Sequence, residues 1–110
     1  YAQSISLLKR PNRPTAIFAG SDLQAMGVYE AARQLGLRIP EDLSVVGFDD
    51  VQTAAFLGPA LTTVRQPLQD MARAAVRMLI EALSTDDVIQ PHIIMPTSLV
   101  VRNSTQQLEG

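Results

Sequence analysis

The sequence contains no cysteine and a single histidine, His92. Without cysteine there is no disulfide framework, thiolate metal site or cysteine nucleophile, and the composition fits a reducing compartment. His92 has no second histidine beside it, so we predict no metal site and expect this side chain on the surface. The sequence also lacks a run of about 18 apolar residues, so we predict no membrane-spanning helix.

An excess of positive charge is also absent, since nine basic residues stand against 11 acidic ones. A domain that holds nucleic acid through its phosphates needs a basic surface, so we expect no DNA contact from this chain itself. The N-terminus shows no basic, apolar and cleavage regions of a signal peptide. Because the first residue is Tyr1 and not Met, we expect a segment of a longer protein.

The 110 residues are 46% hydrophobic, which is enough for one globular unit with its own core. Residues 15–20 form a short, uncharged apolar run that predicts a buried strand, and residues 43–48 predict a second one. The pattern between them, over 23–35, predicts a helix. Strand, helix and strand in this order indicate a right-handed crossover, and therefore an α/β fold built on a parallel sheet.

The helix expected over 23–35 has signals at both ends. Ser21 and Asp22 offer side-chain oxygens to the first N–H groups, and Gly36 suits the left-handed position at the end. Gly27 costs about 1 kcal/mol relative to alanine, which indicates either a close approach by another backbone or partner, or simple tolerance. The inward face is expected to carry Leu23, Met26, Tyr29, Ala32 and Leu35.

Two adjacent carboxylates, Asp49 and Asp50, follow the second strand. Ligands of parallel sheets bind beyond the carboxyl ends of the strands, where an ionised carboxylate offers strong acceptor oxygens. Alternatively, both residues cap a short helix expected over 51–57, and the residues alone support the two interpretations equally. A third possibility is a Mg²⁺-dependent enzyme or phospho-acceptor domain. The sequence has no glycine-rich phosphate loop and no nucleophile with a nearby base, so we predict no enzyme.

The second half of the chain alternates between extended and helical patterns. Apolar residues recur at spacings of three and four after Pro67, which suits the first turn of a helix. The expected elements are an extended segment over 61–66, an amphipathic helix over 68–83, an acidic loop over 84–90, strand material broken by Pro96 over 92–102, and a polar tail over 103–110 that includes a possible cloning remnant.

Three blocks of sequence, taken together, resemble the sensor domain of LacI/GalR-type transcriptional regulators. They are Ala-Ile-Phe-Ala-Gly-Ser-Asp at 16–22, the stretch 36–50 that ends in Gly-Phe-Asp-Asp, and Leu-Thr-Thr-Val-Arg-Gln-Pro at 61–67. The resemblance implies a two-lobed fold similar to periplasmic sugar-binding proteins, which closes on a small effector. Residues 1–64 would belong to its C-terminal lobe. Residues 65–102 would supply a crossover, a helix and a strand shared with an N-terminal lobe outside this sequence.

The resemblance also implies roles for individual residues. Asp49 matches a position whose carboxylate accepts hydrogen bonds from an effector, often a sugar. Ser21 matches a position that commonly carries Asn and contacts effector, and its hydroxyl offers one donor fewer. Asp50 and Asp22 are expected to be helix caps. Arg65 and Gln66 match positions at the hinge of relatives. The dimerisation surfaces of relatives match Met26, Gly27, Tyr29, Phe56 and Leu57.

The resemblance favours the effector-sensing and dimerisation segment of a cytoplasmic repressor without a cofactor, which contacts operator DNA through a separate N-terminal helix-turn-helix. The alternative is a fragment of a secreted sugar-binding transport protein, which a signal peptide further upstream would favour. The helix over 68–83 has no N-terminal lobe to pack on within this sequence. We therefore expect the chain by itself to cover this face by intimate or swapped dimerisation, or by rearranged packing.

Overall fold

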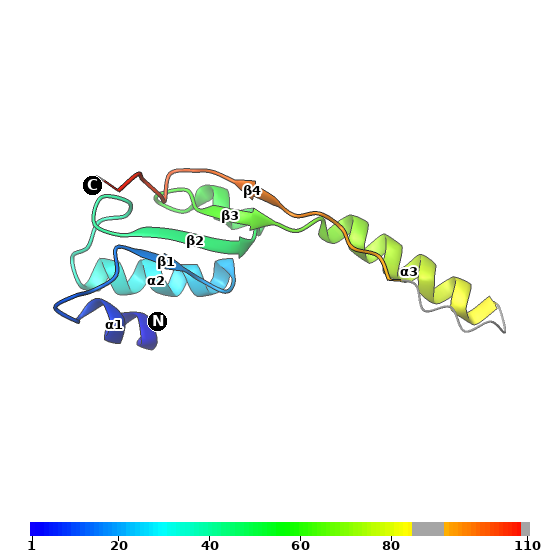
Figure 1. Cartoon of the computed structure of the whole chain (residues 1–110), viewed down its shortest axis with the longest axis horizontal. Coiled ribbons are helices and arrows are strands. Elements are labelled where there is room, and N and C mark those ends of the chain that lie inside the picture. The colour runs from blue at the N-terminus through cyan, green and yellow to red at the C-terminus, as the bar shows by residue number, and fades with distance from the viewer. Residues whose placement is uncertain (85–91, 109–110) are drawn as a thin grey trace. The chain divides into compact units, whose positions relative to one another are not determined.

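The computed structural model describes residues 1–84 and 92–108, so the acidic loop expected over 84–90 lies outside the described residues from position 85 onward. The elements appear close to their expected places (Figure 1). In chain order they are α1 (Ala2–Leu8), β1 (Ala16–Phe18), α2 (Asp22–Gln34), β2 (Ser44–Asp49), the 3-10 helix η1 (Gln52–Phe56), β3 (Thr62–Arg65), α3 (Leu68–Ser84) and β4 (Ser98–Val100).

The strands form one sheet in the order β1-β2-β3-β4. The first three are parallel, with Val46 of β2 opposite Phe18 on one side and Thr62 on the other, while β4 runs antiparallel to β3. Helix α2 packs against β2, and α1 packs against α2 on the side away from the sheet (Figure 1). The crossover from β1 through α2 to β2 confirms the predicted α/β fold with a mostly parallel sheet.

The buried face of α2 differs from the expected one. Leu23 is 76% exposed, and the helix turns its small residues to the sheet. Both stripes satisfy a period of 3.6, so periodicity could not choose between them. The small side chains bring the helix close to β2. The core comprises Leu8, Ala19, Ala25, Val28, Ala31, Ala32, Leu43, Val45, Ala54 and Leu61, with Tyr29 and Leu35 packed at its edge.

The predicted signals at the ends of α2 are confirmed in part. Ser21 is the N-cap, and its hydroxyl oxygen accepts a 3.1 Å hydrogen bond from the backbone N–H of Gln24. Gly36 has a φ of 70°, which is the left-handed conformation expected after the helix. A Cβ on Gly27 would lie 3.0 Å from the backbone nitrogen of Tyr1. Gly27 therefore permits the close approach of another backbone, the first residue before α1.

The chain divides into two compact units, which we describe separately. The first contains residues Tyr1–Arg65 and the chain from Ser98 onward, and the second contains Gln66–Thr97. In the second unit, α3 is the amphipathic helix that the sequence predicted, and none of its residues is buried. The strand expected over 92–102 is shorter than predicted, since β4 covers only Ser98–Val100 and begins after Pro96, which has no N–H to donate.

Residues 103–106 do not form the polar tail that the sequence suggested. Ser104 is fully buried, and its hydroxyl donates to the carbonyl oxygen of Val45 at 2.5 Å and accepts from the N–H of Thr62 at 2.8 Å. The N–H of Gln106 donates to the hydroxyl of Ser44. This part of the chain therefore joins β2 to β3, and polar composition could not reveal it because the hydroxyl is satisfied by backbone partners.

Candidate functional site

The acidic pair lies at the carboxyl end of the parallel strands, as the sequence predicted. Asp49 is the last residue of β2, and it stands opposite Arg65, the last residue of β3. Ser21 follows β1 at the same edge of the sheet and is partly exposed. This edge is where ligands of parallel α/β sheets bind.

The backbone at the acidic pair adopts an uncommon conformation. Asp49 has a φ of 122° and Asp50 a φ of 59°, and they are the only two positive-φ residues other than glycine in the described chain. Such conformations cost about 1–3 kcal/mol each and persist only where the surroundings enforce them. Strained backbone of this kind gathers at ligand-binding and catalytic sites. The turn therefore marks this edge of the sheet as a candidate site.

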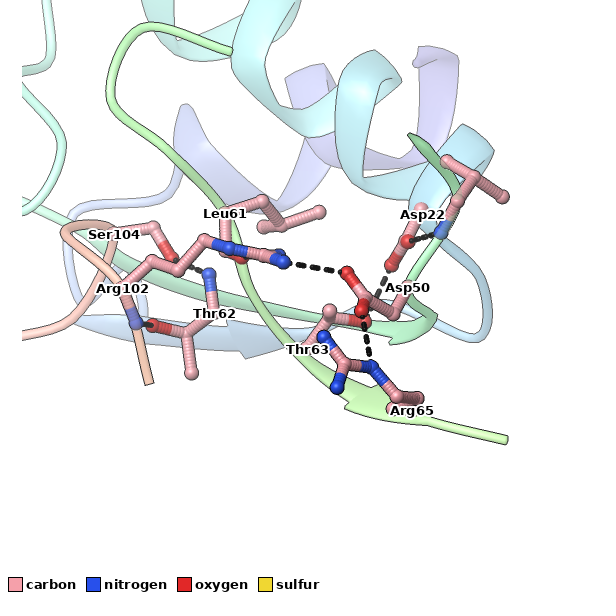
Figure 2. Close-up of polar contacts among 9 residues, drawn as sticks. Asp22, Asp50, Leu61, Thr62, Thr63, Arg65, Arg102 and Ser104 are labelled. Atoms are coloured by element: carbon pink, nitrogen blue, oxygen red, sulfur yellow. Dashed lines mark hydrogen bonds and ion pairs between the residues drawn. The ribbon is translucent and has the colours of Figure 1, made fainter. Parts of the chain in front are cut away.

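Asp50 is held by two arginines from different segments (Figure 2). One carboxylate oxygen accepts a 2.7 Å hydrogen bond from Nη2 of Arg102, and the other accepts one of 2.7 Å from Nε of Arg65. The side chain of Asp50 is only 8% exposed. Burial alone would raise the pKa of Asp50, but hydrogen bonds and charge from the two guanidinium groups outweigh burial and lower this pKa below its usual value.

The interpretation of Asp50 as a helix cap was therefore wrong. Helix η1 starts after Val51 without a side-chain cap, and both oxygens of Asp50 face guanidinium groups instead. Hydrogen bonds from a guanidinium group to a carboxylate are stronger than those from a neutral backbone N–H, because the donor is charged. The sequence contained both arginines, but nothing in their spacing from Asp50 indicated the contact.

Asp22 is not a helix cap either, because its carboxylate points into the protein. The side chain is fully buried and accepts hydrogen bonds from the N–H of Val51 at 2.8 Å and from the hydroxyl of Thr63 at 2.6 Å. Ser21 performs the capping role alone. Asp22 therefore connects the start of α2 to the residue that follows the acidic pair and to β3 (Figure 2).

Arg102 extends this network to the C-terminal part of the chain. Its Nη1 donates to the carbonyl oxygen of Leu61 at 2.8 Å, and its backbone N–H donates to the hydroxyl of Thr62 at 2.9 Å. The side chain of Arg102 is 17% exposed. Sequence reasoning missed Arg102 and Thr63 because hydrogen bonds between segments about 40 residues apart leave no periodic signal.

Three of the five residues predicted for dimerisation line one groove of the first unit. Met26, Tyr29 and Leu57 line a groove of about 650 Å³. The Tyr29 hydroxyl donates to the carbonyl oxygen of Pro59 at 2.8 Å, and burial raises the pKa of Tyr29. Phe56 is 83% exposed, whereas Gly27 faces Tyr1 of the same chain. The role of these residues in dimerisation stays a prediction.

The remaining predicted features are simpler to place. Gln66 is the first residue of the second unit and directly follows Arg65. His92 is exposed. Across residues 1–84 and 92–108, no three side chains of His, Cys, Asp or Glu gather as metal ligands. None of the helices in these ranges is long and apolar enough to cross a bilayer.

Comparisons with known proteins identify this arrangement. The model of the periplasmic binding protein-like domain matches residues 1–105. An uncharacterized HTH-type transcriptional regulator of Streptomyces limosus is 52% identical over 93 residues, which cover 84% of this chain and 26% of that protein.

Two solved structures agree with the sequence matches. A LacI family transcriptional regulator from Enterococcus faecium, with bound ribose, has a TM-score of 0.90 at 28% identity, over 99% of this chain and 40% of that one. The lac repressor dimer bound to operator and the anti-inducer ONPF has a TM-score of 0.85 at 32% identity, over 96% of this chain and 36% of that one. The chain thus spans between about a quarter and two fifths of these relatives. It belongs to the periplasmic-binding-protein-like sensor domains of the LacI family of transcriptional regulators.

Proposed function

We propose that this chain is part of the effector-sensing and dimerisation segment of a transcriptional repressor that responds to a sugar or a similar small molecule. The single observation that carries the proposal is the strained Asp49–Asp50 turn at the carboxyl edge of the sheet, in a chain of this family. Asp49 ends β2 at the edge where ligands of such sheets bind, and strained backbone is common at binding sites, so both features support the proposal.

A sugar suits this edge chemically. An ionised carboxylate such as Asp49 accepts charge-assisted hydrogen bonds from hydroxyl groups, and the partly exposed Ser21 supplies one further hydroxyl. Related structures contain cellobiose, ribose and sucrose. We therefore assign effector binding to Asp49 and Ser21. The opposite wall of the site would come from an N-terminal lobe, with residues 1–64 in the C-terminal lobe and residues 65–102 shared between the lobes.

Transmission of the signal needs a hinge and a partner subunit. We assign the hinge to Arg65 and Gln66, which stand at the boundary between the two compact units. The dimer surface is assigned to Met26, Gly27, Tyr29, Phe56 and Leu57, and the exposed Phe56 is its most accessible apolar side chain. An effector changes the output only when it binds one arrangement of the lobes better than the other.

The competing functions fit less well. A secreted transport protein shares the fold, but the relatives named above are transcriptional regulators, and one of them, the lac repressor, is bound to operator. A Mg²⁺ or phospho-acceptor site built on Asp49 and Asp50 would share the Asp50 carboxylate with two guanidinium groups, each of which donates to one of its oxygens. A regulator without catalytic activity is therefore the function that the geometry favours.

The test uses the full-length protein that contains this chain, and DNA that this protein selects from a random library. Ribose, sucrose and cellobiose are titrated into the protein–DNA complex while fluorescence anisotropy reports the bound fraction. We expect one of these sugars to release the DNA at a concentration near its own dissociation constant. A protein that binds a sugar but selects no DNA would contradict the proposal and favour the transport alternative.

A further inference from the structure

The Asp49–Asp50 turn is held in place by contacts of Asp50 and of Val51, the residue that follows it. The carboxylate of Asp50 accepts hydrogen bonds from Arg65 and Arg102, and the N–H of Val51 donates to the buried carboxylate of Asp22. A φ of 122° at Asp49 lies outside the regions that residues with a side chain normally occupy, and a φ of 59° at Asp50 lies in the left-handed region, which is uncommon even for aspartate. The surrounding contacts must therefore impose this backbone on the chain.

The contacts come from rigid and buried parts of the fold. Asp22 is fully buried at the start of α2, and the Oδ1 atom that does not bind Val51 accepts from Thr63 in the centre of β3. Arg102 is fixed by two further hydrogen bonds to Leu61 and Thr62, which leaves its Nη2 aimed at Asp50 (Figure 2). A binding group is presented accurately when the residues behind it are themselves fixed.

We infer that Asp50 and Asp22 are positioning residues, which hold the strained turn so that the Asp49 carboxylate is aimed at the effector before the effector arrives. This inference rests on the proposed function, because it concerns the geometry of that same site. A free turn would relax to an ordinary β or helical conformation, and the effector would then have to restore the strained one at a cost in affinity.

The first arm of the test needs no sugar. Amide hydrogen exchange is followed in the full-length protein for peptides that cover residues 49–53, in the wild type, Asp50→Asn and Glu41→Gln. Glu41 is an exposed carboxylate that precedes β2 at the opposite end of that strand. We expect faster exchange of this segment in Asp50→Asn and no change in Glu41→Gln. Unchanged exchange in Asp50→Asn would overturn the inference.

The second arm is a double-mutant cycle on affinity for ribose, sucrose and cellobiose, measured by calorimetry. Asp50→Asn should lower the affinity for the sugar that binds the wild type by about tenfold, similar to the smaller losses that follow removal of a residue supporting a metal ligand. In the Asp49→Asn background the same change should have little further effect, since Asp50 acts through Asp49. A purely structural role would weaken binding by an equal factor in both backgrounds, and that result would contradict the inference.

The outcomes separate this inference from the proposed function. A wild-type sugar affinity in Asp49→Asn would contradict the proposed effector site itself. A wild-type affinity in Asp50→Asn, together with a weakened affinity in Asp49→Asn, would contradict only the positioning role. If Asp50→Asn does not fold, Arg65→Gln replaces it, because that variant keeps the bond between Asp50 and Arg102 and removes a side chain that is 56% exposed. It should show the same pattern at smaller amplitude, and wild-type exchange together with wild-type affinity would overturn the inference.

Discussion

Gly47 of β2 leaves the space that the carboxylate of Asp22 occupies. A Cβ on Gly47 would collide with Oδ1 of Asp22, the same atom that accepts the hydrogen bond from Thr63. The glycine in the Gly-Phe-Asp-Asp block is therefore required by a buried acid more than 20 positions earlier in the chain. This contact packs Asp22, which binds the N–H that follows the acidic pair, directly against β2.

Replacement of Gly47 by alanine should destabilise the protein by about 1–3 kcal/mol, because the added methyl group forces the buried Asp22 or Leu61 to move. The measurement is the free energy of unfolding in urea. Gly58→Ala is the matched control, since no atom lies within 4 Å of a Cβ there. Equal stability of the two variants would show that the close contact at Gly47 has no consequence.

Asp50 should make the stability of the protein depend on acid pH. Its folded pKa lies below the ordinary value, so its contribution is complete above the unfolded pKa, near pH 4, and is lost as the pH falls through the folded pKa. Asp50→Asn should therefore cost about 1–3 kcal/mol at pH 7 and clearly less at pH 3. Urea midpoints of both proteins between these pH values check this. A difference that is constant with pH would contradict the ion-pair account.

Ser104→Ala should destabilise the protein by about 1–3 kcal/mol, because it leaves the carbonyl of Val45 and the N–H of Thr62 without this hydroxyl in the core. Ser6→Ala, at an exposed position of α1, is the control and should change the unfolding free energy little. Equal unfolding free energies of the two variants would show that the buried hydroxyl of Ser104 does not stabilise the protein.

The apolar face of α3 should drive association when the 110-residue chain is made alone. Val76 is 56% exposed, Ile80 61% and Leu83 80%, and an apolar surface of this kind favours a partner. Light scattering should find dimers or larger species, and Val76→Glu with Ile80→Glu should shift the chain towards monomer. Gln69→Glu, on the same helix, should not. A monodisperse wild-type monomer would contradict this expectation.

Most of the fold was predictable because it depends on local patterns. The apolar runs of β1 and β2, the serine cap and glycine end of α2, and the amphipathic period of α3 all lie within about 15 residues of sequence. The inward face of α2 was not predictable in this way, since Leu23 and Ala25 fit helical periods equally well. The short β4 and the burial of Ser104 depend on pairing with strands far away in the chain.

The location of the site was predictable, but the hydrogen bonds and ion pairs among its residues were not. The position of Asp49 and Asp50 after a buried strand indicated the carboxyl edge of the sheet. The roles of Asp22 and Asp50 were wrong because a carboxylate beside a helix start suits a cap equally well. Only the folded chain shows that Arg102 reaches Asp50, at a separation of 52 residues.

The most direct test of the account is the sugar affinity of the full-length protein with and without the Asp49 carboxylate. Calorimetric titration with ribose, sucrose and cellobiose should find a sugar that binds the wild type. Asp49→Ala should lower the affinity for that sugar by about tenfold or more, which corresponds to at least 1.4 kcal/mol. Glu41→Ala, at the opposite end of β2 from Asp49, should bind as the wild type does. Equal binding by Asp49→Ala and the wild type would contradict the assignment of this turn to effector recognition.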